Sequence, residues 1–225
     1  MLITEKRICI EISKQEVCHY IGYDTSCKIP ARISSLIDEY IECAHYLIEP
    51  KYSYNIRDVD WIQGSTVVIE GSIIFESRVL ANLLEQCHKV VVFLTTIGEN
   101  LGDAVCRLSV DGHVLQATVL DAIGSIAIER LVDSVQDRIE TVAGAQGFVT
   151  SQRFSPGYCG WDLNQQKQLF QVVDNDKVGV RLNDECLMIP QKSVSGIVGI
   201  GLTGGSIGDY KPCEICGNYA CMGRR

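Results

Sequence analysis

Hydrophobic residues recur at three- and four-residue spacing in two long segments, a periodicity that predicts amphipathic helices. The first segment covers residues 29–48 and is followed by Pro50, which cannot continue a helix. The second runs from about Val114 to Val142 and stops before the glycines of residues 144–147. Shorter helical patterns cover residues 77–87, a segment that begins at Glu99, and residues 163–173.

Consecutive β-branched and apolar residues mark the predicted strands. Residues 66–69 and 71–75 are two such runs joined at Glu70 and Gly71, which indicates a hairpin. Residues 89–96 are apolar at almost every position, which is typical of a central strand buried on both faces.

The last part of the chain adds predicted strands at residues 178–182 and 186–189. Residues 193–202 are apolar and glycine-rich, and they fit either a strand or a helix packed closely on the sheet. Helices and strands follow one another without regular β-α-β alternation. The sequence therefore predicts an α+β fold, a single domain whose central mixed or antiparallel sheet is flanked by helices including one long helix. We assign this domain to residues 1–205 and a glycine- and cysteine-rich C-terminal tail to residues 206–225.

Composition narrows the class of protein. The chain has 225 residues, 46% of them hydrophobic, which is enough for one sizeable core. It has no run of about eighteen apolar residues, and no signal-peptide core follows the N-terminal charges. We therefore expect a cytoplasmic protein with no membrane association. The net charge of −8 and the scattered lysines and arginines argue against nucleic acid as a partner.

Cysteine is abundant, with eleven residues in the chain. Eight lie singly, several in apolar surroundings, as expected of reduced core residues rather than of a disulfide scaffold. The other three, Cys213, Cys216 and Cys221, cluster in the tail. Their spacing suits thiolate ligands of an iron–sulfur cluster or a zinc ion, with a fourth ligand from elsewhere. We favour a metal site over the alternative of a flexible tail with free thiols.

Candidate binding chemistry is concentrated in two motifs. Residues 153–158 (Arg-Phe-Ser-Pro-Gly-Tyr) predict a tight loop, because Pro156 and Gly157 favour a turn and let the backbone approach a ligand. Arg153 can bind a carboxylate through two hydrogen bonds, and Tyr158 can stack on a ligand or pack the loop onto the core. Residues 188–195 (Met-Ile-Pro-Gln-Lys-Ser-Val-Ser) place polar groups at the end of an apolar run. This chemistry suits a small zwitterion or anion.

The order and separation of these motifs resemble the activation domain of cobalamin-dependent methionine synthase. Arg-x-x-Pro-Gly-Tyr is followed, about thirty residues later, by Pro-x-x-Ser-Val-Ser. The segment Leu120–Ser125 adds a resemblance to free-standing proteins that carry this domain without the rest of the enzyme. The resemblance covers residues 120–195, whereas the N-terminal third is similar only in the order of its elements.

The resemblance implies an S-adenosylmethionine (AdoMet) site. The loop, with Arg153, Ser155, Pro156, Gly157 and Tyr158, would bind AdoMet. The helical Glu129, or Asp133 one turn later, would contact its amino group. The alternative for these two acids is an ordinary solvated helix face near Arg130. Ser193 and Ser195 would brace the loop or bind the ligand.

The function implied is that of an accessory protein for reductive reactivation of cobalamin. It would present AdoMet to cobalamin carried by a corrinoid-binding protein or a methionine synthase core, with an electron donor such as a flavodoxin or ferredoxin. Its enzymatic role would be that of a methyltransferase component. Two alternatives stay open: a non-catalytic subunit or docking partner of a corrinoid methyltransferase, and an iron–sulfur electron donor.

Overall fold

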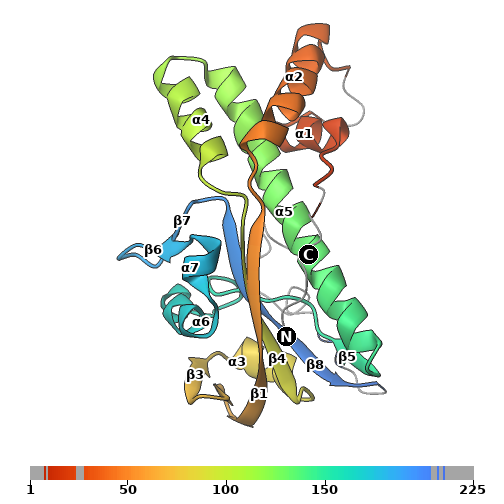
Figure 1. Cartoon of the computed structure of the whole chain (residues 1–225), viewed down its shortest axis with the longest axis vertical. Coiled ribbons are helices and arrows are strands. Elements are labelled where there is room, and N and C mark those ends of the chain that lie inside the picture. Colours follow the sequence, from red (N-terminus) through yellow and green to blue (C-terminus); the bar gives the residue numbers. More distant parts are fainter. Residues whose placement is uncertain (1–7, 9, 24–27, 204–206, 208–209, 211–225) are drawn as a thin grey trace.

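A single twisted antiparallel sheet forms the centre of the molecule (Figure 1). The computed structural model describes residues 8, 10–23, 28–203, 207 and 210. Six strands lie in the order β3-β2-β1-β4-β8-β5, and each neighbouring pair is antiparallel. Their bounds are β1 Lys51–Gln63, β2 Thr66–Ile69, β3 Ile73–Glu76, β4 Lys89–Thr96, β5 Phe148–Thr150 and β8 Ser193–Leu202.

The long helix α5 (Val114–Gly144) packs on one face of the sheet, and three helices pack against α5: α1 (Lys14–Tyr20), α2 (Ala31–Leu47) and α4 (Asn100–Val110) (Figure 1). The long helix α5 lies along the sheet because its buried residues repeat at helical spacing and face β4 and β8. Gly124 lets α4 approach α5 closely. A Cβ there would lie 2.6 Å from Leu101 Cδ2.

Shorter elements cover the opposite face (Figure 1). They are α3 (Arg78–Leu84), the 3-10 helix η1 (Leu163–Gln165), α6 (Gln166–Val172) and α7 (Asn175–Val178). The buried Trp161 anchors this second core. Its ring stacks on Phe154 at 5.6 Å and meets Phe75 edge-on at 5.6 Å. A small separate hairpin, β6 (Arg181–Leu182) with β7 (Met188–Ile189), lies beside this layer.

The α+β prediction is confirmed, and the sheet is antiparallel. The β2–β3 hairpin, the buried strand β4 and the long helix α5 all form as expected. Residues 193–202, for which the sequence fitted either a strand or a helix, form a strand. The prediction of a strand over residues 178–182 is wrong at its start. Val178 ends helix α7, and Gly179 adopts a left-handed conformation with φ 76°, so only residues 181–182 pair.

Candidate functional site

The predicted loop lies directly beside strand β8. Phe154 and Ile197 exchange two backbone hydrogen bonds, of 3.0 and 2.8 Å. Gly196 makes this approach possible, because a Cβ there would lie 2.7 Å from the Phe154 carbonyl oxygen and 2.8 Å from Ser155 Oγ. The Phe154 ring is buried against Trp161, whereas the preceding Arg153 side chain reaches helix α5. The loop thus joins the two layers of the fold.

The Pro-Gly-Tyr turn is held by its own backbone. Gly157 has φ 92°, a conformation that suits glycine, and its N–H donates to the Trp161 carbonyl at 2.7 Å. The Trp161 N–H in turn donates to the Tyr158 carbonyl at 2.9 Å. The Tyr158 side chain is 48% exposed, so Trp161 and Phe154, rather than Tyr158, pack this loop onto the core. The Tyr158 ring is therefore accessible for stacking on a ligand.

Arg153 is the centre of an ionic cluster on helix α5. Its side chain is only 10% exposed. Arg153 Nη1 lies 2.9 Å from Asp133 Oδ1 and donates to Gln136 Oε1 at 2.9 Å, and Nη2 lies 3.0 Å from Glu129 Oε2. The structure thus brings Arg153 together with the predicted Glu129 and with its fallback, Asp133. Arg130 pairs instead with Glu16 of α1.

This arrangement leaves part of the guanidinium unused. The cluster occupies the outer edge, formed by the two Nη atoms, whereas Arg153 Nε donates no hydrogen bond to any residue that the structure describes. A guanidinium presents a second edge, formed by Nε and one Nη, with the geometry of a carboxylate. Arg153 can therefore stay bound to α5 and still accept a ligand carboxylate on its other edge.

The two serines of the second motif lie on the other face of the sheet. Residues of a strand alternate between faces, and Ser193 and Ser195 share the face of Ile197, which belongs to the Trp161 core. Ser193 Oγ donates to the Pro190 carbonyl at 2.7 Å and lies 2.8 Å from Thr96 Oγ1. Ser195 Oγ is buried and has no hydrogen-bond partner among the described residues. These hydroxyls are not adjacent to the Arg153 cluster.

Lys192 connects the second motif to the same helix. Its Nζ lies 2.7 Å from Asp121 Oδ1 and donates to Ser125 Oγ at 2.7 Å, and its side chain is 13% exposed. Lys192, and Gln136 beside Arg153, were not predicted as site residues from sequence. The sequence offers one signal, the spacing of the residues that contact Lys192 and Arg153. These are residues 121, 125, 129, 133 and 136, which lie on one stripe of a helix. Each motif is therefore fixed to α5 by one basic side chain.

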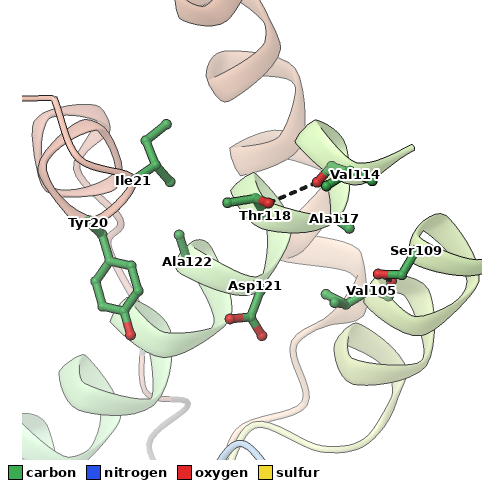
Figure 2. Close-up of a pocket in the computed structure, with 9 residues that line it drawn as sticks. All are labelled: Tyr20, Ile21, Val105, Ser109, Val114, Ala117, Thr118, Asp121 and Ala122. Atoms are coloured by element: carbon green, nitrogen blue, oxygen red, sulfur yellow. Dashed lines mark hydrogen bonds between the residues drawn. The ribbon is translucent and has the colours of Figure 1, made fainter. Parts of the chain in front are cut away.

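A pocket of about 310 Å³ lies near the N-terminal end of α5 (Figure 2). Figure 2 shows Tyr20 and Ile21 of the α1 end on one side, residues of α4 on the other, and α5 between them. Its lining residues are Tyr20, Ile21, Val105, Ser109, Val114, Ala117, Thr118, Asp121 and Ala122. None of the site residues predicted from sequence lines it. Asp121 precedes Glu129 by eight residues, or about 12 Å of helix.

The cysteines predicted to bind metal, Cys213, Cys216 and Cys221, lie outside the described residues. Within the described part of the chain there is no group of three or more histidine, cysteine or acidic side chains placed to hold a metal ion. Burial raises the pKa of the Cys87 thiol to about 11, as expected of a cysteine packed in a core.

Part of the chain is similar to a known protein family. Residues 145–201 match the family described as the activation domain of vitamin B12-dependent methionine synthase. The matched segment includes the loop of residues 153–158 and both serines, Ser193 and Ser195. The resemblance inferred from the two motifs is thereby confirmed over this part of the chain.

A solved structure matches most of the chain. It is the MetH reactivation domain in complex with AdoHcy, with a TM-score of 0.58 and 12% sequence identity. The match covers 84% of this chain and 77% of the solved one. At this identity the match shows a shared fold. No curated protein matches the chain in sequence.

Proposed function

We propose that the protein binds AdoMet at the loop of residues 153–158 and acts in reductive remethylation of cobalamin. The cobalamin would belong to a corrinoid-dependent methionine synthase or a related methyltransferase. The observation that carries this proposal is the Arg153 cluster. Arg153 lies inside the segment that matches the activation domain family, and it brings a cation together with two carboxylates of α5, which precede that segment.

The cluster suits the amino-acid end of AdoMet. The ligand carboxylate would bind the second edge of Arg153, and the ligand ammonium group would bind Glu129. The half-exposed Tyr158 would stack on the adenine or the corrin, and the turn around Gly157 would bring backbone groups close to the ligand. Ser155 and Pro156 shape the loop, and Ser193 and Ser195 support the strand behind it.

The catalytic contribution proposed here is orientation. AdoMet would supply the methyl group to the cobalamin of a partner protein, which a donor such as a flavodoxin or ferredoxin would first have reduced by one electron. The chain would hold the sulfonium methyl group toward the partner, a task of proximity that needs no general acid or base. The protein would thus serve as a component of cobalamin-dependent methionine synthase.

Two further expectations belong to this proposal. We place the activity in the cytoplasm, and no described helix is long and apolar enough to cross a membrane. The tail of residues 206–225 would hold an iron–sulfur cluster or a zinc ion through its three cysteines, separately from the AdoMet site in residues 1–205.

Calorimetric titration with AdoMet tests the proposal. The full chain should bind AdoMet, and Arg153→Ala should weaken binding by about 1.5–3 kcal/mol, the range for a hydrogen bond to a charged group. Arg130→Ala is the matched control, because Arg130 also forms an ion pair on α5 but binds Glu16 instead of the cluster. This control should bind as the wild type does.

Other outcomes would redirect the proposal. Wild-type protein that does not bind AdoMet would favour a docking subunit of a corrinoid methyltransferase. Binding that is unaffected by Arg153→Ala would place the site elsewhere. Iron and sulfide in protein that does not bind AdoMet would favour an electron donor.

A further inference from the structure

The pocket between α1, α4 and α5 is a concave site apart from the Arg153 cluster (Figure 2). Its volume of about 310 Å³ lies at the lower end of the range for small-molecule sites, about 300–1,000 Å³. Packed helices are a common location for such sites. Neither Arg153 nor any of its partners on α5 lines this pocket. A ligand in it would therefore be distinct from one bound at the Arg153 cluster.

Most of the pocket wall is apolar. Aliphatic side chains from the end of α1, from α4 and from α5 form it. Two wall residues are also open to solvent, because Tyr20 is 58% exposed and Val114 is 68% exposed. An occupant with a compact apolar body would cover these surfaces and release water from them, which favours binding.

The two hydroxyl groups of the pocket act as hydrogen-bond acceptors. Ser109 Oγ donates its hydrogen to the Val105 carbonyl at 2.9 Å, and Thr118 Oγ1 donates to the Val114 carbonyl at 2.9 Å, as Figure 2 shows for Thr118. A hydroxyl has one hydrogen and two lone pairs, so a hydroxyl whose hydrogen is engaged offers lone pairs to a ligand. Both groups thus favour a ligand that carries hydrogen-bond donors.

Asp121 adds a negative charge to these acceptors. Its Oδ1 lies 2.7 Å from Lys192 Nζ, but Asp121 is 45% exposed and Lys192 only 13%. Asp121 lines the pocket and Lys192 does not. A carboxylate can accept about four hydrogen bonds, so the contact with Lys192 leaves acceptor sites on Asp121. A ligand in the pocket would meet the carboxylate of this ion pair rather than its cation.

We propose that this pocket binds a small organic amine, a primary ammonium group on a compact apolar body. An ammonium group has three donors and no acceptor, which complements the hydroxyl and carboxylate oxygens of the pocket. Asp121 and Thr118 are three residues apart on α5 and so are neighbours on one helix face, where one ammonium group can reach both. An anionic ligand would place its acceptors and its charge against Asp121. This inference does not depend on AdoMet binding at residues 153–158.

NMR titration of the full chain with benzylamine, benzyl alcohol and benzoate tests the proposal. The three probes share one ring and differ in their head groups. Benzylamine should bind most tightly and benzoate least, and the shifted amide resonances should lie in α1, α4 and the first half of α5. Because Asp121 is half-exposed, we expect the amine to bind about two- to fivefold more tightly than the alcohol.

Two variants at the ion pair should act in opposite directions. Asp121→Asn should weaken benzylamine binding by about two- to fivefold and leave benzyl alcohol binding unchanged. Lys192→Met should strengthen benzylamine binding, because it removes the cation that shares the Asp121 carboxylate. If the ion pair only supported the fold, both variants would weaken binding. Asp103→Asn is the control, since Asp103 is an exposed residue of α4 outside the pocket.

A third variant tests the apolar wall. Tyr20→Ala should weaken benzylamine and benzyl alcohol alike, by about threefold or more. Tyr46→Ala is its matched control, because Tyr46 is a tyrosine of α2 that is 89% exposed and lies outside the pocket. Thermal melting checks that each variant is folded.

Several outcomes would overturn the proposal. Benzylamine that does not bind, that binds no better than benzyl alcohol, or that shifts resonances elsewhere would exclude an amine site in this pocket. Benzylamine affinity that is unchanged in Asp121→Asn, or lowered in a folded Lys192→Met protein, would show that Asp121 does not bind the ammonium group.

Discussion

Gly196→Ala tests the contact that positions the candidate loop. Gly196 lies in β8, next to Ile197, the residue with which the loop of residues 153–158 pairs through Phe154. An added Cβ would lie 2.7 Å from the Phe154 carbonyl oxygen, 2.8 Å from Ser155 Oγ and 2.9 Å from Phe93 Cζ, all inside ordinary contact distance. The Ser155 hydroxyl can rotate away. The backbone carbonyl and the buried Phe93 ring cannot, because hydrogen bonding and core packing fix them.

The expected cost follows from these contacts. Overpacking a well-filled site by one methyl group costs about 1–3 kcal/mol, and the displaced backbone places this site toward the upper end. Alanine also restricts the unfolded chain, which offsets about 0.4–1 kcal/mol. The net destabilisation should be about 2 kcal/mol.

Urea denaturation followed by tryptophan fluorescence measures this change, since Trp161 lies in the core next to the loop. Gly102→Ala is the control. Gly102 is an exposed residue within α4, no atom lies within 4 Å of its added Cβ, and alanine should stabilise the helix by about 0.5–1 kcal/mol. If Gly196→Ala matches the stability of the wild type or of Gly102→Ala, the loop does not approach β8 as described.

Two more predictions concern the α3 side of the sheet. Ser77→Ala should destabilise the protein by about 1 kcal/mol in the same denaturation assay, because Ser77 Oγ accepts the Leu80 N–H at 3.2 Å and caps α3. A cost near zero would show that the cap is not needed. Cys87 should resist iodoacetamide at pH 8, where a pKa of about 11 leaves about one thiol in a thousand ionised, whereas the exposed Cys43 and Cys106 should react. Mass spectrometry of the native protein would contradict this if Cys87 were alkylated as fast as they are.

The sequence predicted the elements whose burial is complete. Strand β4 is buried at seven of its eight positions and reads as an unbroken apolar run. Strand β1, which pairs with β4, was not predicted from sequence although it has thirteen residues. Its positions are half-buried or exposed, and its sequence mixes charged and aromatic residues, so no unbroken apolar run marks it. Its conformation is set by pairing with β4 rather than by its own pattern.

The candidate site could be predicted only in part. Local chemistry identified the loop, because Pro156 and Gly157 restrict the backbone wherever they occur. The partners of Arg153 are 17 to 24 residues away in sequence, and only the packing of α5 on the sheet brings them together. The same packing determines which sheet face a β8 residue occupies, which separates Ser193 and Ser195 from Arg153. The roles of these serines stay a prediction.

Helix α5 also limits where the chain tolerates a change in length. The two motifs come from separate parts of the sequence, yet Lys192 binds Asp121 and Ser125 while Arg153 binds residues one to three turns further along the same helix. One residue inserted between these anchor points would rotate the rest of α5 by about 100°. The helix residues that bind Arg153 would then no longer face it while those that bind Lys192 stay in place. The surface loops can lengthen without this penalty. Insertions within residues 121–133 would therefore separate the two motifs, whereas insertions at the ends of α5 would leave them in register.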